Sequence, residues 1–378
     1  MSTLVHTVRL LGSAGVDSGR GDGWVLFEDG RVSASGAGGD LPAAREVVDG
    51  RGGCLVPGFI DIHGHGGGGA GFDDGPEAIR AARAVHRAHG TTRAVLSLIT
   101  APIDELAARV AMVADVTESD PTILGSHLEG PFLDPGHKGA HAAALLRAPD
   151  AASVDRLLEA GRGSIRQVTL APELPGAFEA ISRFVDAGVA VAVGHTDADA
   201  AVARRAFDAG ATILTHAFNA MNGIHHRAPG PVVAALRDDR VTVEIIADGV
   251  HVDLALIATL FAADGDRMAL VTDAMAAAGA ADGRYVLGGL AVRVDGGVAR
   301  LEDGGAIAGS TLTQDAAVRN VVAAGVALDD AVRAATQTPA QAIGRPDLGR
   351  LDEGSLADAV LLDDDLAVRR VWVAGSSD

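Results

Sequence analysis

Eight short apolar runs divide the central part of the chain, and stretches rich in alanine, arginine and aspartate separate most of them. Within those stretches the apolar residues recur at helical spacing, as at residues 77–89, 104–116 and 198–209. Apolar strands alternating with helices are typical of a parallel sheet buried on both faces. Eight such units predict a (β/α)8 barrel, and a doubly wound open sheet is the competing fold. The runs span residues 58–62, 92–97, 122–128, 167–170, 189–193, 212–215, 242–247 and 268–272.

The two ends of the chain carry a different pattern, made of short β-forming runs separated by glycine and aspartate. Such punctuation is typical of hairpins in a small sheet. Because the pattern occurs at both ends, we expect both ends to form one small β domain. The runs span residues 7–11, 24–28, 31–35 and 46–49 near the start, and 357–362 and 371–374 near the end.

The composition narrows the classes of partner and the compartment. Aspartate and glutamate number 50 against 31 lysines and arginines, which makes the net charge −19. Such a surface argues against nucleic acid and anionic membranes, although a locally basic pocket would still accept a small anionic substrate. Cys54 is the only cysteine, so an internal disulfide is excluded and a reducing compartment is favoured. We see no signal peptide in residues 1–15 and no membrane-spanning run, and expect a cytoplasmic protein.

The first apolar run of the barrel ends in two histidines. Residues 55–69 read LVPGFIDIHGHGGGG, which places one residue between His63 and His65. Alternate residues of a strand share a face, so both imidazoles, with Asp61 before them, are expected to project the same way. The glycines that follow permit a sharp turn and a close approach of other groups. The pair therefore indicates a metal site.

Four other runs end in residues that suit the same ion: Glu129, His195, His216 and Asp273. In a barrel the C-terminal ends of the strands meet on one rim, where active sites lie. Imidazole nitrogen and carboxylate oxygen are ligands of zinc and similar divalent ions. A single histidine at a strand end is more often a hydrogen-bonded structural residue, and a single carboxylate a helix cap. Five strands that all end in suitable residues make a joint pattern that favours a metal centre.

The longer loops hold further polar groups. Arg227 and His251 are candidates for the basic groups that an anionic substrate needs, although loop arginines are usually solvated. His225 and His226 are adjacent, and adjacent residues rarely face one pocket. The remaining histidines are given structural roles: His86 and His89 on a solvated helix face, and His127 in strand packing.

Nine segments in order make the chain similar to a known family. The sequence resembles the N-acetylglucosamine-6-phosphate deacetylases of the amidohydrolase superfamily. The resemblance implies a metal-dependent (β/α)8 barrel over residues 55–347 and a small β-sandwich domain built from residues 1–54 and 348–378. The segments are PGFIDIHGHG, HLEGPFL, KGAH, LAPE, VGHTDA, THAFNAMN, ADGVH, VTDAM and AGSTLT.

The resemblance also implies roles for particular residues. Glu129, His195 and His216 would hold the main metal, and Asp273 would act as the acid and base. His63 and His65, which some members of the family lack, would hold a second ion. Zinc is the expected metal, with iron, cobalt or manganese as alternatives. The implied substrate-binding residues are Ala140, His141, Asn219, Ala220, Arg227, Asp248, His251, Ile307, Ala308 and Gly309.

The implied reaction is hydrolysis of the N-acetyl group of N-acetyl-D-glucosamine 6-phosphate. A water activated by the metal would attack the amide, while Asp273 takes a proton and then returns it to the leaving nitrogen. Arg227 and His251 would reach the phosphate from a neighbouring subunit, so a homodimer is expected. Two alternatives remain: an amidohydrolase with a different N-acyl or cyclic amide substrate, and a non-catalytic sensor of amino-sugar phosphates. Activity on N-acetylgalactosamine 6-phosphate is left open.

Overall fold

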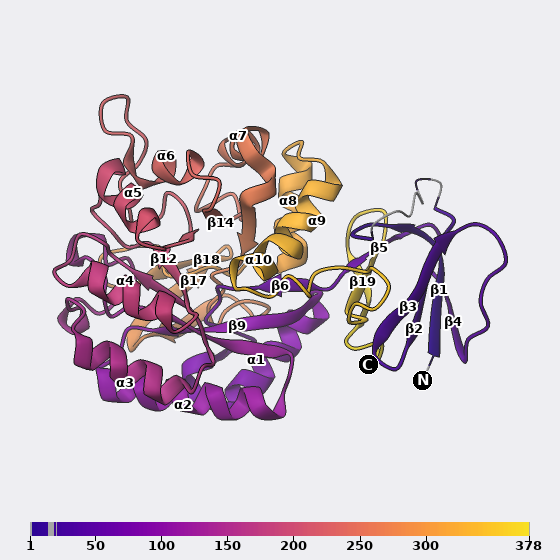
Figure 1. Cartoon of the computed structure of the whole chain (residues 1–378), viewed down its shortest axis with the longest axis horizontal. Coiled ribbons are helices and arrows are strands. Elements are labelled where there is room, and N and C mark those ends of the chain that lie inside the picture. The colour runs from indigo at the N-terminus through magenta and orange to yellow at the C-terminus, as the bar shows by residue number, and fades with distance from the viewer. Residues whose placement is uncertain (1, 14–18, 20, 378) are drawn as a thin grey trace.

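The computed structural model describes residues 2–13, 19 and 21–377. Residue 1 and part of the segment searched for a signal peptide lie outside the described residues. A large body of strands and helices carries a smaller β domain at its side, and both ends of the chain lie in the smaller part (Figure 1).

The large body is built on an eight-stranded parallel sheet, in which each strand pairs with its neighbours in chain order. The eight predicted runs are its eight strands, and the predicted barrel fold is confirmed. The strands are apolar because helices cover the outside of the sheet while the opposite side chains fill its interior. They are β6 (Phe59–Asp61), β9 (Thr91–Ile99), β10 (Ile123–Glu129), β11 (Ile165–Leu170), β12 (Ala190–Val193), β13 (Ile213–Leu214), β14 (Thr242–Ile246) and β15 (Met268–Val271).

The first and last barrel strands meet through a buried carboxylate. Asp61 accepts hydrogen bonds from the Thr272 hydroxyl at 2.6 Å and from its backbone N–H at 3.3 Å. The backbone N–H of Asp273 donates to the carbonyl of His63 at 2.8 Å. Burial raises the pKa of Asp61 to about 6, against these hydrogen bonds, which lower it. The contacts bring His63 and Asp273 to the same point of the rim.

Ten helices cover the barrel in the described part of the chain. Several begin at an aspartate whose side chain accepts a hydrogen bond from the first turn, as Asp150, Asp199 and Asp253 do. The aspartates of the predicted helical stretches thus include N-caps. The helices are α1 (Pro76–Ala88), α2 (Ile103–Ser119), α3 (Ala151–Gly161), α4 (Ala177–Asp186), α5 (Ala200–Asp208), α6 (Gly230–Leu236), α7 (Leu254–Asp264), α8 (Gln314–Ala323), α9 (Leu328–Ala335) and α10 (Gln337–Ala342).

The smaller part is a seven-stranded sheet with strands from both ends of the chain. Its core contains Phe27 and Trp372, whose rings meet edge to face at 6.0 Å. The division into residues 1–54 with 348–378 and residues 55–347 stays a prediction. The strands are β1 (Ser2–Leu10), β2 (Gly23–Glu28), β3 (Arg31–Ala37), β4 (Glu46–Asp49), β5 (Cys54–Pro57), β19 (Ala359–Leu362) and β20 (Val368–Trp372).

A separate antiparallel sheet follows the last barrel strand, and our prediction does not include it. Its strands are β16 (Gly283–Leu287), β17 (Leu290–Asp295) and β18 (Val298–Leu301), joined by glycine pairs. Its buried face packs in one apolar cluster with Ile99, Ala140 and Met275. The sheet therefore lies beside the C-terminal ends of the barrel strands. The short strands β7 (Gly66–Gly67) and β8 (Ala70–Gly71) and the 3-10 turns η1 (Phe72–Asp74), η2 (Pro135–His137), η3 (Ala143–Leu145) and η4 (Gly265–Arg267) complete the structure.

Candidate metal centre and substrate cavity

The residues predicted at the strand ends come together on one rim. Glu129 is the last residue of β10, while His63, His195, His216 and Asp273 each lie two residues beyond a strand. Three of the five have a backbone φ in the left-handed region: 48° at His195, 24° at His216 and 47° at Asp273. Side chains other than glycine rarely adopt this conformation, and such strain is concentrated at functional sites. Each left-handed residue turns the chain sharply where the strand stops.

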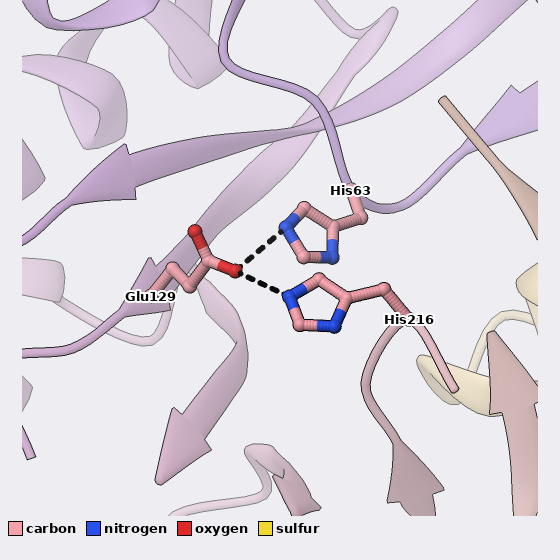
Figure 2. Close-up of side chains that lie close together, drawn as sticks. All are labelled: His63, Glu129 and His216. Carbon is pink, nitrogen blue, oxygen red and sulfur yellow. Dashed lines mark hydrogen bonds and ion pairs between the residues drawn. The ribbon is translucent and has the colours of Figure 1, made fainter. Parts of the chain in front are cut away.

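Glu129 lies at the centre of the group. Its Oε1 is 3.1 Å from His63 Nε2 and 3.2 Å from both His195 Nε2 and His216 Nε2. Its Oε2 is 3.1 Å from His65 Nε2 and 3.3 Å from His141 Nε2. Figure 2 shows His63 and His216 directed at the same carboxylate oxygen. Five imidazoles thus surround one buried carboxylate.

The partners of the outer ring nitrogens indicate which inner nitrogens carry no proton. His195 Nδ1 lies 2.9 Å from the His137 carbonyl, and His63 Nδ1 lies 3.0 Å from Glu244 Oε2. Both oxygens only accept, so each Nδ1 donates, and in a neutral imidazole Nε2 is then a lone-pair acceptor. The His195 and His216 Nε2 atoms also lie only 3.0 Å apart. Acceptor nitrogens that converge on a carboxylate oxygen suit a cation at their centre.

Without a metal ion, protons would have to supply that positive charge. Burial opposes ionisation of Glu129, but the charge of His63 and hydrogen bonds from His141, His195 and His216 hold the pKa of Glu129 well below its usual range. For His65, burial lowers the pKa, while hydrogen bonds to Asp273 and Glu129 outweigh it and raise the pKa to about 9. A divalent ion would replace these protons, so the donor set fits a metal ion of the zinc type.

Asp273 faces the centre from the last strand. Its Oδ1 is 3.3 Å from His65 Nε2 and 3.7 Å from His63 Nε2. Without a metal ion, burial would raise the pKa of Asp273, but the charge of a protonated His63 and the hydrogen bond with His65 lower it to about 2. The carboxylate is therefore ionised at neutral pH and available to accept a proton.

Three groups of side chains in the described residues have ligand atoms close enough to share an ion. Each expected metal ligand belongs to at least one group. His141, expected among the substrate-binding residues, also belongs to one. The groups are His63 with Glu129 and His216, His63 with His65 and Asp273, and Glu129 with His141 and His195.

A second layer supports these side chains, and sequence reasoning missed most of it. Glu244 is fully buried on β14, where its Oε2 accepts from His63 Nδ1 at 3.0 Å and from the His216 backbone N–H at 3.3 Å. Its Oε1 accepts from Gln167 Nε2 at 2.7 Å. His127, assigned to strand packing, is buried with its ring centroid 4.6 Å from that of His63. A charged residue inside the apolar run 242–247 was the available signal for Glu244.

The glycines after His65 allow two close contacts. A Cβ on Gly66 would lie 2.3 Å from the carbonyl oxygen of Ala70, so the hairpin of β7 and β8 requires glycine there. The carbonyl of Gly66 accepts a hydrogen bond from His86 Nε2 at 2.9 Å. His86 is buried, with 3% of its surface exposed, so its predicted position on a solvated helix face is wrong. Its neighbour His89 is partly exposed and lies 3.1 Å from Asp315.

A cavity of about 330 Å³ opens beside the centre. Glu129, His195, His216, His65 and Asp273 form one side of it. Its lining also includes Leu287 of the unpredicted sheet, together with Ile99 and Ala306. Of the expected substrate-binding residues, those that line the cavity are Ala140, His141, Asn219, Ala220, His251, Ile307 and Gly309.

Three expected substrate-binding residues do not line the cavity of the single chain. Ala308 is fully buried in the apolar cluster beneath it. Asp248 accepts from His251 Nδ1 at 2.6 Å; burial lowers the pKa of His251, but this carboxylate raises it above its usual value. Arg227 is exposed on a loop, where its Nη1 lies 2.7 Å from His226 Nε2.

Comparisons with known proteins agree with this arrangement. A sequence model of the amidohydrolase family matches residues 54–377. An N-acetylgalactosamine-6-phosphate deacetylase from Escherichia coli O157:H7 is 39% identical over 328 residues, which are 85% of this chain and 86% of that protein. An N-acetylglucosamine-6-phosphate deacetylase from Vibrio furnissii is 37% identical, over 85% of this chain and 82% of its own.

A solved structure extends the likeness to three dimensions. It is a variant of the N-acetyl-D-glucosamine-6-phosphate deacetylase of Mycobacterium smegmatis, in complex with N-acetyl-D-glucosamine-6-phosphate. It is 44% identical to this chain with a TM-score of 0.94, and the match covers 100% of this chain and 98% of that one. The chain belongs to the amidohydrolase family and, within it, to the group of deacetylases of N-acetylated amino-sugar 6-phosphates.

Proposed function

We propose that this protein hydrolyses the N-acetyl group of N-acetyl-D-glucosamine 6-phosphate and releases D-glucosamine 6-phosphate and acetate. The observation that carries the proposal is the ionised Asp273 beside a ring of imidazoles around Glu129, at the edge of a cavity of about 330 Å³. The names of the relatives support the substrate class. A sensor would need no such acid–base residue beside a metal centre, and the comparisons do not favour an unrelated amide substrate.

We assign the divalent ion to Glu129, His195 and His216, whose ligand atoms lie within 3.2 Å of one another. His63 and His65 would hold a second ion when metal is abundant. Zinc is the proposed metal because imidazole and carboxylate are its usual ligands. An ion bound here would activate a water molecule and polarise the acetyl carbonyl.

Asp273 performs the proton transfers in the proposed reaction. Its carboxylate takes a proton from the attacking water and passes that proton to the nitrogen as the amide bond breaks. One water molecule is consumed, and the products are the free amine and acetate. His141, whose Nδ1 lies 2.8 Å from the Thr100 hydroxyl, is held in place to steady the developing oxyanion or a sugar hydroxyl.

The remaining cavity residues would hold the sugar. Asn219 donates through Nδ2 to the carbonyls of His216 and Ala217, both at 3.2 Å, which fixes its side chain at the cavity wall. Arg227 is exposed and outside the cavity of its own chain, which supports the proposal that it reaches the phosphate in a second subunit. The resemblance implies that His251 reaches the phosphate from the neighbouring subunit together with Arg227, but it lines the cavity of its own chain. With its raised pKa, it would supply a positive charge to a phosphate bound in that same cavity.

The proposal extends to the compartment of the protein. Cys54 is a free thiol, which suits a reducing environment, and we propose the cytoplasm. None of the helices in the described part of the chain is both long and apolar enough to cross a membrane.

An assay of acetate release tests the proposal. Purified protein is given N-acetylglucosamine 6-phosphate, N-acetylgalactosamine 6-phosphate or unphosphorylated N-acetylglucosamine, with and without a chelator. We expect rapid release from a phosphorylated sugar, weak release from the neutral sugar, and loss of activity on chelation that zinc restores. Absence of acetate release from N-acetylglucosamine 6-phosphate in metal-loaded protein would overturn the proposal, whether or not N-acetylgalactosamine 6-phosphate is hydrolysed.

A further inference from the structure

A second cavity, of about 490 Å³, lies between helix α1 and strand β20 of the small sheet. It shares no lining residue with the cavity at the metal centre. Its wall includes Arg83, which donates to the carbonyls of Thr91 and Thr92 at the start of β9. The metal centre lies at the opposite ends of the strands. The charged residues of its wall are Arg80, Arg83, Arg87, Arg369, Arg370 and Asp120.

The charge of this wall is exceptional for an acidic protein. Among the described residues, five arginines and only one acidic residue line this cavity, although the whole chain carries −19. That carboxylate, Asp120, already accepts hydrogen bonds from the Thr122 backbone and hydroxyl, at 2.9 and 2.7 Å. Arginine is always charged and hydrogen-bonds phosphate in a planar fork, so this arrangement suits a phosphate-bearing anion.

Arg83 gives the strongest indication. It is 95% buried, because only 5% of its surface is exposed, and its Nε and Nη1 have no hydrogen-bond partner among the described residues. Burial, and then the positive charge of Arg87, lower the pKa of Arg83 to about 10. The charges of Asp120 and Asp61 raise the pKa of Arg83, but they do not outweigh burial and the neighbouring arginines. The buried charge of Arg83 is therefore still disfavoured, and an anion bound in the cavity would stabilise it further.

Arg80, Arg369 and Arg370 differ in the protein groups that they contact. Arg80 has a long contact of 3.9 Å with Glu77, and 64% of its side chain is exposed. Arg369 donates from Nη1 to the carbonyl of Gly50 at 3.0 Å. This acceptor is uncharged, so the bond does not neutralise the charge of Arg369. Arg370 is different, since it pairs with Glu46 at 2.5 Å.

The wall also has an apolar side. Val368, Val371 and Val373 line it together with Ala84 and Ala88. The volume falls within the range of about 300–1,000 Å³ that is usual for small-molecule sites and exceeds what a single phosphate needs. A ligand with a carbon skeleton would use both sides of the cavity.

We propose that the cavity between α1 and β20 is a binding site for a small organic phosphate, distinct from the substrate cavity. The phosphate groups would meet the arginines of α1 and β20, and the carbon skeleton would lie on the valines. Because the ligand would contact the barrel and the small sheet at once, its binding would stabilise the contact between them.

Calorimetric titration of the metal-loaded protein tests this site, with fructose 1,6-bisphosphate as the probe. Fructose and inorganic phosphate are titrated in parallel. The variant Arg80→Gln with Arg87→Gln removes two charges of the cavity. A matched control, Arg156→Gln with Arg204→Gln, removes two charges from helices α3 and α5, outside the cavity.

We expect the bisphosphate to bind the native protein with a dissociation constant below about 1 mM and to raise the melting temperature. The cavity variant should bind at least about tenfold more weakly, and the control should match the native protein. Absence of binding, equal binding by the cavity variant, or equal weakening in the control would overturn the proposal. Inorganic phosphate that binds as well as the bisphosphate would overturn the assignment to an organic ligand.

A single variant guards against misfolding of the double one. Arg369→Gln removes an exposed charge from β20 and leaves helix α1 unchanged. It should weaken binding of the bisphosphate by about threefold or more while the rate of acetate release stays at the native level. Unchanged binding by this variant would contradict the site in the same way.

Discussion

The cavity at the metal centre and the cavity between α1 and β20 are both lined by basic side chains, yet they suit ligands of opposite charge. Around Glu129 the basic groups are imidazoles, and His63 and His195 direct acceptor nitrogens inward because their outer nitrogens donate to oxygen. Between α1 and β20 they are guanidinium groups, such as Arg83, which stay protonated and can only donate. The first set suits a cation and the second an anion.

The difference shows that the protonation state of buried nitrogens, rather than their number, decides what a site binds. Imidazole can lose its proton near neutral pH, so a carboxylate and a metal ion can take over the charge balance. A guanidinium group cannot lose its proton in a protein, so an anion has to neutralise its positive charge.

Replacement of Asp273 with Asn removes the proton acceptor at the metal centre. We expect kcat to fall by about 10³-fold, since acid–base catalysis contributes about 10²–10⁴-fold, while zinc content and KM change little. Steady-state assays of acetate release, with elemental analysis of the same preparation, measure both. Near-native turnover would exclude Asp273 as the acid and base.

Replacement of Glu244 with Gln alters the groups that orient two imidazoles. In glutamine, an NH2 group replaces one of the two accepting oxygens. The side chain at position 244 can then no longer accept hydrogen bonds from His63 Nδ1, the His216 backbone N–H and Gln167 Nε2 at the same time. We expect metal affinity or activity to fall about 10- to 100-fold. Glu173→Gln is the matched control, because Glu173 bonds Thr196 and Asp197 instead. Equal losses in both variants would reject the positioning role.

Steady-state kinetics should distinguish Arg227 from the arginines of the cavity between α1 and β20, because only Arg227 is proposed to bind the substrate. Arg227→Ala is expected to raise KM for the phosphorylated sugar about tenfold and to leave the neutral sugar unaffected, because only the phosphate needs that charge. The pair Arg80→Gln and Arg87→Gln should leave both KM values near native. If Arg227→Ala impaired both sugars equally, its role as a phosphate anchor would fail.

His86 in helix α1 and His89, the residue directly after this helix, show both protonation states and offer the smallest test. Burial lowers the pKa of His86 to about 4, whereas the hydrogen bond to Asp315 raises the pKa of His89 above 6.5. The His89 contribution is therefore complete below pH 6.5 and is lost as the pH rises through its folded value. Burial raises the pKa of Asp315, but the hydrogen bond with His89 and further contacts outweigh it and lower the pKa from 3.8 to about 2. The contribution of Asp315 to stability is therefore complete above pH 3.8 and is lost as the pH falls through the folded value.

His89→Gln should thus lower the free energy of unfolding most between pH 3.8 and 6.5. Because His89 is half-exposed, the loss should stay below about 1 kcal/mol. The difference from the native protein should shrink as the pH rises further. Urea unfolding at several pH values measures it, and a difference that grows with rising pH would contradict the pair.

Much of the barrel could be predicted because its strands are buried on both faces. Such strands form unbroken apolar runs, and the polar residue that ends each run stands out, as Glu129 and His216 do. Residues 283–301 were missed although the alternation and paired glycines of a small antiparallel sheet are present. Their attachment to the rim depends on packing against Ile99 and Met275, which lie elsewhere in the sequence.

Other features depend on contacts between distant segments and leave little local trace. His86 lies on a helix with polar neighbours, and only the approach of Gly66 makes its position buried. Glu244 reads as one polar residue in a strand until His63 is placed beside it. The arginine cavity joins α1 to β20, which come from opposite ends of the chain.

The account rests on Glu129 as the shared carboxylate of a metal centre, and the zinc content of the purified protein tests it most directly. Native protein and Glu129→Gln are loaded with zinc, freed of excess metal and measured by elemental analysis, with circular dichroism to verify folding. We expect one or two ions per native chain and almost none in the folded variant, since the carboxylate meets all five imidazoles. A folded variant that keeps the native zinc content would contradict the account.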